Sequence, residues 1–346
     1  MELGIDSFAA IMSGVSGDTP SPAGRIATLL EEIEMADRCG LDVFGIGEHH
    51  RPEFLDSSPA VILAAAAAKT KSIRLTSAVT VLSAADPVRV FQEFATLDLI
   101  SQGRAEIVVG RGSFGEAYPL FGLRFEDYDA LFAEKLQLLL EIRATENVHW
   151  SGRFRPAISG QGIYPRPLQP EIPIWLGVGG SRQSFARAGL LGLPLMVAII
   201  GGEFRRFRPL VDLYREAWRR AGHPPERQRV GIHALGFVAG SSQEARDTFY
   251  PGWSHMFTQI GRERGWSPVT RAQFEAQCGP GGAFLIGDPE TVARKLLEAS
   301  DDLGGVSRFT FQMSSASAEH EAMLKSIELL GTEVAPLVRK AVSPRT

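Results

Sequence analysis

The chain has 346 residues, of which 44% are hydrophobic, so it can bury a large core and does not have the composition of a disordered protein. Its 36 basic and 40 acidic residues give a net charge of −4, and the absence of a long single-sign run argues against a nucleic-acid or anionic-membrane partner. The two cysteines form neither a disulfide framework nor a zinc pattern, and the longest apolar run, 59–68, is far shorter than the roughly 20 residues of a membrane span.

Short apolar runs alternate along the chain with longer stretches of helical pattern. Continuous apolar runs are typical of parallel strands that are buried on both faces, and Asp-Pro at 86–87 and at 288–289 marks two helix starts. Strands are predicted at 3–8, 43–46, 73–80, 105–109, 174–178, 195–199, 229–239 and 308–313. Helices are predicted at 24–39, 59–70, 87–101, 126–145, 182–191, 203–221, 242–248, 289–303 and 317–340. Eight strand–helix units predict an α/β fold, a (β/α)₈ TIM barrel with insertions, as a single domain over 1–346.

Two segments interrupt this alternation. Residues 146–173 are rich in proline and aromatic residues, which excludes a helix and favours an extended path over the surface. Residues 250–282 are rich in Trp, Phe, Gly and Pro, and they predict an insertion after the seventh strand. Long insertions at the carboxyl ends of barrel strands are more often functional than inert, so we expect this one to lie over the barrel mouth.

Two adjacent histidines follow the second predicted strand, where a barrel has its active-site face. The segment reads Gly47, Glu48, His49, His50. Strand alternation predicts that His49 points into the barrel mouth and His50 away from it, which makes a shared metal ion unfavourable. Glu48 either orients His49 or pairs with a nearby cation. The alternative to a functional role for the two histidines is that one packs in the core and the other is exposed.

A glycine-rich segment, 110–115, follows the fourth predicted strand and matches G-x-G-x-x-G literally. A dinucleotide fingerprint needs a helix to open at once, but Pro119 and Gly122 interrupt the next stretch, so we reject that interpretation. Two alternatives remain open. Either the strand end presents Arg111 to an anion, or the segment is a plain loop with an arginine facing solvent.

A second glycine-rich segment, 177–184, follows the fifth predicted strand and opens a helix. Glycines allow close backbone approach, and the first-turn N–H groups with the helix dipole attract an anion, so this turn predicts a phosphate site. Ser181 and Ser184 add hydroxyl donors. The alternative is Ser181 as an ordinary N-cap, and barrel phosphate sites more often follow strands seven and eight.

Signatures of several other enzyme classes are missing. The sequence contains no G-x-S-x-G, no P-loop and no C-x-x-C motif. These absences argue against a serine hydrolase, a P-loop kinase and a thiol oxidoreductase. No basic segment precedes an apolar run at the start, so we expect no signal peptide and a cytoplasmic protein.

Taken together, these segments resemble the luciferase-like, flavin-dependent monooxygenases, in order along nearly the whole chain. The resemblance is carried by 47–50, 75–82, 86–90, 93–104, 109–112, 173–177, 179–181 and 287–290. It implies a (β/α)₈ barrel that binds reduced FMN or, in some branches, the deazaflavin F420.

The resemblance also implies roles for single residues. Arg111, Ser181 and Ser184 would hold the flavin phosphate, and Gly179 and Gly180 would supply backbone donors. The pair Ala78 and Val79 matches a position where the family often has a non-prolyl cis peptide under the flavin ring. His49 matches the active-site histidine, and the 250–282 segment matches a mobile lid.

The implied activity is a monooxygenase that uses reduced FMN and O₂ to oxidise a small organic substrate, with a separate NAD(P)H:flavin reductase. The alternatives are an F420-dependent oxidoreductase and a non-catalytic flavin-binding protein. The nearly all-apolar helix at 59–70, with the helix at 87–101, predicts a homodimer contact, as the resemblance does. Aromatic residues that either line an apolar substrate cavity or pack in the core are Phe114, Tyr118, Trp253 and Trp266.

Overall fold

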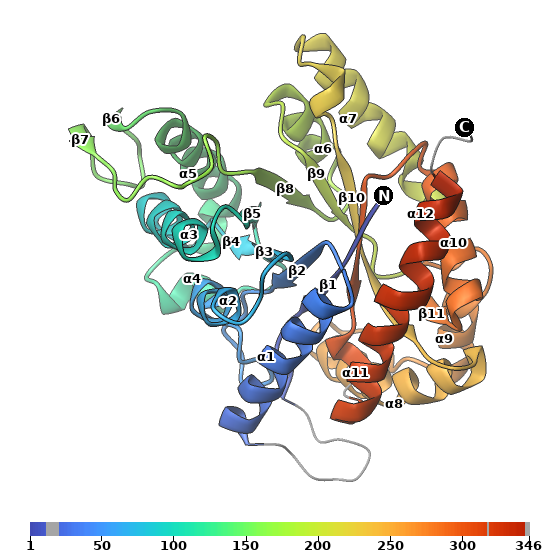
Figure 1. Ribbon diagram of the computed structural model, residues 1–346. Helices are drawn as coiled ribbons and strands as arrows, with labels where there is room; N and C mark the ends of the chain where they lie inside the picture. Colours follow the sequence, from blue (N-terminus) through green and yellow to red (C-terminus); the bar gives the residue numbers. More distant parts are fainter. Residues whose placement is uncertain (12–20, 317, 343–346) are drawn as a thin grey trace.

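A closed barrel of parallel strands, surrounded by helices, forms the centre of the computed structural model, which describes residues 1–11, 21–316 and 318–342 (Figure 1). Within these residues, each barrel strand pairs in parallel with the next, and β12 lies between β10 and β1 to close the barrel. The eight barrel strands are β1 (Glu2–Ser7), β2 (Val43–Ile46), β3 (Arg74–Ser77), β5 (Ala105–Gly110), β8 (Ile174–Val178), β9 (Leu195–Ala198), β10 (Val230–Val238) and β12 (Arg308–Gln312). The predicted TIM-barrel fold is confirmed, and every barrel strand overlaps its predicted range.

The helices cover the outside of the barrel and begin where the sequence signals predicted. Asp86 accepts hydrogen bonds from the backbone N–H groups of Val88 and Arg89, and Asp288 accepts one from Thr291. Gly40 follows the first helix with a φ of 73°, a left-handed conformation that glycine adopts without strain. The covering helices are α1 (Pro22–Arg38), α2 (Pro59–Ala67), α3 (Pro87–Ser101), α5 (Tyr128–Ala144), α6 (Arg182–Leu190), α7 (Arg208–Arg220), α10 (Pro289–Asp302), α11 (His320–Leu329) and α12 (Ala335–Val342).

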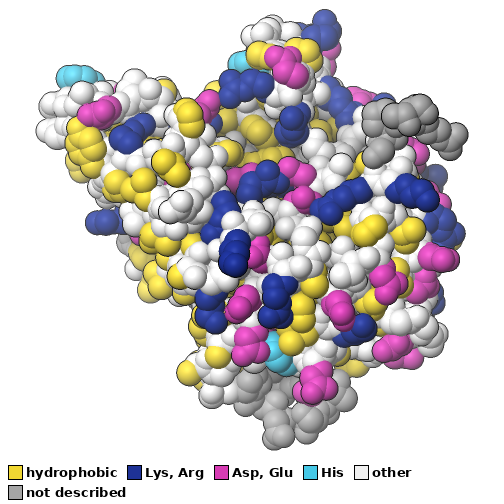
Figure 2. All heavy atoms as spheres, viewed as in Figure 1, with side chains coloured by type: hydrophobic (Ala, Val, Ile, Leu, Met, Phe, Trp, Pro, Cys, Tyr) yellow, Lys and Arg dark blue, Asp and Glu magenta, His cyan; other side chains and the backbone are white. Residues whose placement is uncertain are grey.

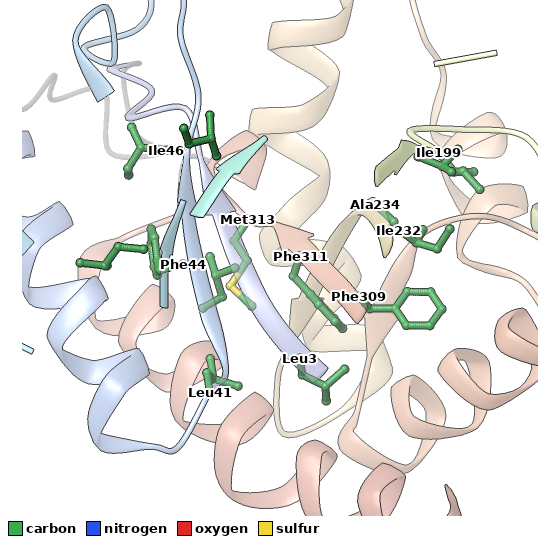
Figure 3. Packing of buried hydrophobic residues seen from close by; sticks show 14 of the residues in the cluster. Leu3, Leu41, Phe44, Ile46, Ile199, Ile232, Ala234, Phe309, Phe311 and Met313 are labelled. Atoms are coloured by element: carbon green, nitrogen blue, oxygen red, sulfur yellow. The ribbon is translucent and has the colours of Figure 1, made fainter. Parts of the chain in front are cut away.

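Alternation along the strands separates an apolar outer layer from a polar barrel interior. On β12, Phe309 points toward the surrounding helices (Figure 3). Its neighbours point inward, where Arg308 pairs with Glu106 of β5 at 2.7 Å and Thr310 donates to Asp6 of β1. Because β12 and β5 are not adjacent strands, the Arg308 pair crosses the interior. The barrel therefore encloses buried hydrogen-bonded charges below its mouth.

The insertion after the seventh barrel strand differs from the predicted one. The sequence placed the helix end at 248 and an irregular segment after it, but the helix continues through Pro251 to residue 263. At Gly252 an added Cβ would lie 2.1 Å from the carbonyl oxygen of Ala316, so glycine lets the helix pack closely on that turn. The elements of this region are α8 (Ser242–Glu263), α9 (Arg271–Cys278) and β11 (Leu285–Gly287).

The other interrupting segment, 146–173, contains no helix, as predicted. Its strands β6 (Asn147–Trp150) and β7 (Ile158–Gly162) form an antiparallel hairpin that projects beside α5 (Figure 1). The Tyr164–Pro165 peptide bond is cis. Shorter elements elsewhere are β4 (Thr80–Val81), α4 (Ala117–Leu120), the 3₁₀ turns Phe125–Asp127, Phe204–Phe207, Pro225–Arg227 and Ser314–Ala316, and a π-helical turn at Leu330–Val334.

The surface carries both signs of charge. On the face in Figure 2, acidic and basic side chains are interspersed rather than gathered by sign. In the described part of the chain, no helix combines the length and hydrophobicity that crossing a bilayer requires.

Candidate active site

One cavity of about 620 Å³ opens at the carboxyl ends of the barrel strands. Its walls come from the segments that follow β2, β5 and β8, from the inner face of the barrel, and from the far half of α8. The volume lies within the range of cofactor and small-ligand sites in proteins. Of the candidate site residues, His49, Ala78, Val79, Arg111, Gly179 and Gly180 line this cavity. Ser181 and Ser184 lie beside it, at the start of α6.

His49 is held by a carboxylate that the sequence did not reveal. Its Nδ1 lies 2.8 Å from Oδ2 of Asp56, and its backbone N–H donates to Oδ1 of the same carboxylate at 3.1 Å. Asp56 is fully buried, and this burial raises the pKa of its carboxyl group, although the contacts with His49 act in the opposite direction. Because Asp56 engages Nδ1, the other ring nitrogen, Nε2, is left to face a ligand.

Aromatic side chains surround the His49 ring. The ring centroids of Phe8 and Phe54 each lie 4.6 Å from that of His49, and Phe114 lies edge-on at 5.5 Å. The rings make the surroundings of the largely buried His49 side chain less polar, which strengthens its contact with Asp56.

His50 does not point away, contrary to the prediction from strand alternation. Strand β2 ends at Ile46, so alternation does not extend to this loop, and His50 also lines the cavity. Its Nε2 lies 3.2 Å from Oε1 of Glu48, whose other oxygen accepts from the backbone N–H of Val81 at 2.9 Å. Glu48 therefore holds His50 and the β4 backbone, and Asp56 takes the orienting position at His49.

A second histidine–aspartate pair lies deeper in the barrel and was missed in the sequence. His233 of β10 places Nδ1 2.6 Å from Oδ2 of Asp6 in β1, and Thr310 donates to the same oxygen. The Phe8 ring stacks on His233 at 5.8 Å and also contacts His49, so one phenylalanine contacts two of the three histidines that line the cavity. Strand positions separated by 227 residues carry no local motif, and only barrel closure brings them together.

The candidate phosphate site combines Arg111 with the N-terminus of α6. Arg111 Nη2 donates to Oγ of Ser184 at 3.3 Å, its Nη1 pairs with Asp129, and its guanidinium lies 4.9 Å from the Tyr128 ring centroid. Ser181 is at the N-cap position but makes no side-chain capping bond. The ordinary N-cap explanation for this serine is therefore not what the structure shows.

Space and donors at this turn suit a phosphate. Added Cβ atoms at Gly179 and Gly180 would meet nothing within 4 Å, so the space at the N-terminus of α6 is free. In the described part of the chain, the backbone N–H groups of Arg182 and Gln183 have no hydrogen-bond partner. An arginine, a serine hydroxyl and first-turn amide groups are the donors that a phosphate dianion prefers.

The peptide bond between Ala78 and Val79 is cis, as the resemblance led us to expect. Glycines on three strands make room for these two side chains. A Cβ would lie 2.6 Å from Val79 at Gly110, 2.8 Å from Val79 at Gly177, and 2.9 Å from Ala78 at Gly45. The glycine that opens the literal G-x-G-x-x-G match thus accommodates Val79, and no long helix follows it.

Two of the four aromatic candidates line the cavity, and the other two do not. Phe114 and Trp266 line the cavity, whereas Tyr118 and Trp253 are buried in packing. The two arginines that flank Phe114 are Arg51, at 5.0 Å from its ring centroid, and Arg264, at 5.1 Å.

Arg51 joins three segments around the mouth. It forms a bidentate pair with Glu263 of α8 at 2.6 and 2.8 Å, pairs with Glu116 at 2.6 Å, and contacts both oxygens of Glu53. The hydrogen bonds with Glu263 are the main reason that the pKa of Arg51 is raised. We call Arg51 and these three glutamates the clasp, because they tie the end of α8 to the loops after β2 and β5.

Metal ligands do not gather anywhere in the described residues. No group of three or more His, Cys, Asp or Glu side chains there has the arrangement of a metal site. The site chemistry that the side chains offer is anion binding at Arg111 and α6, and proton transfer at His49.

A family model for the luciferase-like monooxygenases matches residues 5–306 of the chain. The chain belongs to this family. A 23% identical relative, 3,6-diketocamphane 1,6-monooxygenase of Pseudomonas putida, aligns over 89% of this chain and 92% of its own length. The match and the named relatives place the protein among the luciferase-like oxidoreductases.

Two solved structures share the fold of this chain. The oxygenating constituent of 3,6-diketocamphane monooxygenase from P. putida, in complex with FMN, superposes with a TM-score of 0.79 at 21% identity, covering 98% of both chains. The coenzyme F420-dependent tetrahydromethanopterin reductase of Methanopyrus kandleri gives 0.73 at 18% identity, covering 97% of this chain and 98% of that one. A flavin-type cofactor is thus common to these relatives, and its kind differs among them.

Proposed function

We propose that this luciferase-like protein is a monooxygenase that uses reduced FMN and O₂ to oxidise a small organic molecule. The observation that carries the proposal is that one cavity combines two kinds of site. Arg111 and the α6 N-terminus offer an anion site, and the His49–Asp56 pair offers proton transfer.

The side chains present fit a flavin mononucleotide. Arg111, Ser184 and the amide groups that begin α6 would hold the phosphate, with Ser181, Gly179 and Gly180 around it. The Ala78–Val79 segment would support the ring system, because both residues line the cavity. When bound and reduced, the flavin supplies the two electrons that activate O₂.

His49 has the role of holding or moving a proton at Nε2. The reaction must place one oxygen atom of O₂ in the substrate and release the other as water, which requires proton transfer in the cavity. Asp56 fixes the ring through Nδ1, so a proton taken up or released at Nε2 stays compensated by a buried carboxylate. The three phenylalanines around His49 keep bulk water away from this step.

Two alternatives remain for the cofactor and the activity. An F420-dependent oxidoreductase would transfer hydride without O₂, and relatives such as the M. kandleri reductase support it. A non-catalytic flavin-binding protein would have the same phosphate site without turnover. The terminal phosphate dianion of FMN matches the compact set of donors at Arg111, and we favour FMN on that ground.

Partners follow from the same proposal. The P. putida relative is described as an oxygenating constituent, which supports a separate NAD(P)H:flavin reductase here as well. We also propose a cytoplasmic homodimer that buries α2 and α3, because Val61 of α2 is 70% exposed and Leu99 and Ile100 of α3 are also exposed.

The test is binding followed by oxygen uptake. Purified protein is titrated without oxygen with reduced FMN and, separately, with reduced F420, and O₂ consumption is then measured in the presence of candidate ketones. We expect tighter binding of FMN and substrate-dependent uptake. Preferential F420 binding with hydride transfer in the absence of O₂ would establish the first alternative, and flavin binding without turnover would favour the second.

A further inference from the structure

We propose that Asp129 competes with the phosphate of the cofactor for Arg111 and thereby keeps the flavin exchangeable. This inference rests on the proposed function, since it concerns the candidate phosphate site of the same cavity. A flavin that a separate reductase supplies must enter and leave the protein in every catalytic cycle. A carboxylate beside the phosphate-binding arginine would weaken the hold on the phosphate and speed that exchange.

The two terminal nitrogens of the Arg111 guanidinium have partners of different charge. Nη1 forms an ion pair with Asp129 of α5, and Nη2 donates to Oγ of Ser184 in α6 at 3.3 Å. A phosphate binds an arginine most strongly when two of its oxygens accept from two N–H groups of the guanidinium. Ser184 is a neutral group that can share this phosphate, whereas Asp129 is an anion that must give up Nη1 to it.

Arg111 does not depend on Asp129 for its position. The Tyr118 hydroxyl donates to the backbone carbonyl of Arg111 at 3.3 Å, and the Tyr128 hydroxyl donates to that of Gly112 at the same distance. The ring centroid of Tyr128 also lies 4.9 Å from the guanidinium carbon, in a cation–π contact. Removing the charge of Asp129 should therefore free the guanidinium for an incoming anion without displacing it.

A second arginine, Arg187 of α6, belongs to the same electrostatic environment. Burial is the main reason that its pKa is lowered; the charge of Arg111 lowers this pKa further, and the charge of Asp129 raises it. The two guanidinium groups and the carboxylate are thus close enough to act on one another. Asp129 cancels part of the positive potential that the two arginines would otherwise present to a phosphate dianion.

Solvent exposure limits the size of this competition. The side chain of Asp129 is 67% exposed and that of Arg111 is 22% exposed. An ion pair so open to solvent is weak and is screened by salt, so a phosphate dianion can break it. The carboxylate still lies beside the bound dianion, and like charges at such a separation in water lower the affinity about five- to thirtyfold. Asp129 therefore weakens binding without closing the site.

Asp129→Asn tests the competition, because it removes the charge at an exposed position and keeps the shape of the side chain. The FMN affinity should rise about five- to thirtyfold, mainly through slower dissociation, while the affinity for riboflavin, which has no phosphate, stays constant. Fluorescence titration and stopped-flow displacement measure these changes. Asp127→Asn is the matched control, since it removes the same charge from a carboxylate that pairs with Arg153, and it should change neither affinity.

Salt and a second background separate competition from a structural role. The gain in Asp129→Asn should shrink as the ionic strength rises. It should also shrink when Arg111→Ala is present, because no guanidinium then remains to compete for. A gain of full size in that background would overturn the inference, as would an FMN affinity that is unchanged or lower in Asp129→Asn. A lower affinity would show that Asp129 positions Arg111 for the phosphate.

Inorganic phosphate separates this inference from the proposed function. Titrated alone and followed by phosphorus NMR, it should bind Asp129→Asn more tightly than the unaltered protein, because the competition concerns the anion and not the ring system. Failure of FMN to bind, with this preference intact, would contradict the proposed function alone. Equal affinities of the two proteins for inorganic phosphate would overturn the inference, whichever flavin binds.

Discussion

Two histidines of the same cavity, His49 and His233, are each paired with an aspartate, and the two pairs differ in how the chain builds them. His49 and Asp56 belong to one loop and are seven residues apart, whereas His233 and Asp6 lie on β10 and β1 and meet only because the barrel closes. The loop pair faces the mouth under α8, and the strand pair is bonded into the interior through Thr310.

This difference predicts which pair takes part in the reaction and which pair stabilises the fold. In both pairs the carboxylate engages Nδ1, so the orientation of the ring alone does not separate them. Their surroundings do, because His49 lies in a loop among the rings of Phe8, Phe54 and Phe114, whereas the His233 pair is fixed between two strands. We therefore expect the loop pair to control turnover and the strand pair to control folding.

The largest expected effect is on turnover in His49→Ala. Loss of a general acid–base group typically costs about 10²–10⁴-fold in rate, and the variant should still bind reduced FMN while releasing H₂O₂ instead of product. Product formation, H₂O₂ release and flavin affinity are measured side by side. The control is His255→Ala, an exposed histidine on α8. Near-normal coupled turnover of His49→Ala would remove His49 from the mechanism.

A smaller loss is expected for Asp56→Asn, because the imidazole remains but its ring is no longer compensated by a carboxylate. We expect roughly a 10–10²-fold decrease in kcat with little change in KM, by analogy with other histidine-orienting carboxylates, whose loss is costly. The pH profile of kcat is the second readout. A profile and a rate identical to those of the unaltered enzyme would show that Asp56 only packs.

In the strand pair, Asp6→Asn should affect stability more than rate. The change leaves His233 and Thr310 with a weaker buried acceptor, which costs about 1–3 kcal/mol of the free energy of unfolding. Urea unfolding measures it, and turnover should fall less than tenfold. If Asp6→Asn abolishes turnover while the protein remains folded and binds flavin, the roles of the two pairs are reversed.

The smallest effect concerns the clasp at the mouth. Arg51→Gln removes the ion pairs to Glu263 and Glu116, so α8 should open more readily and reduced FMN should dissociate a few times faster. Added salt should speed dissociation in the unaltered protein and have less effect in the variant, because exposed ion pairs are screened. Arg262→Gln, which removes an arginine of α8 next to Glu263, is the control. If both proteins respond to salt alike, the clasp does not control FMN dissociation and only stabilises the structure.

Much of the fold could be predicted because its signals are local. Continuous apolar runs mark the barrel strands, and Asp-Pro pairs mark the starts of α3 and α10. The length of α8 could not be predicted, since Pro251 and Gly252 disfavour a helix and the close packing of Gly252 on Ala316 is a tertiary contact.

The candidate site divides in the same way. His49, Arg111 and the turn before α6 stand in short motifs and could be proposed from the sequence. Asp56 lies in an irregular loop without a motif, and His233 lies in the middle of an apolar strand, where a histidine is usually part of the core. Their partners are set by tertiary contacts that no local pattern encodes.

The central claim is that one cavity binds a flavin with its phosphate at Arg111, and equilibrium titration of Arg111→Ala with FMN and with riboflavin tests it most directly. Only FMN carries the dianion that a guanidinium binds strongly, so its affinity should fall about 10–10²-fold while the riboflavin affinity stays nearly constant. Equal losses for both ligands, or no loss for either, would contradict the placement of the phosphate and the proposal built on it.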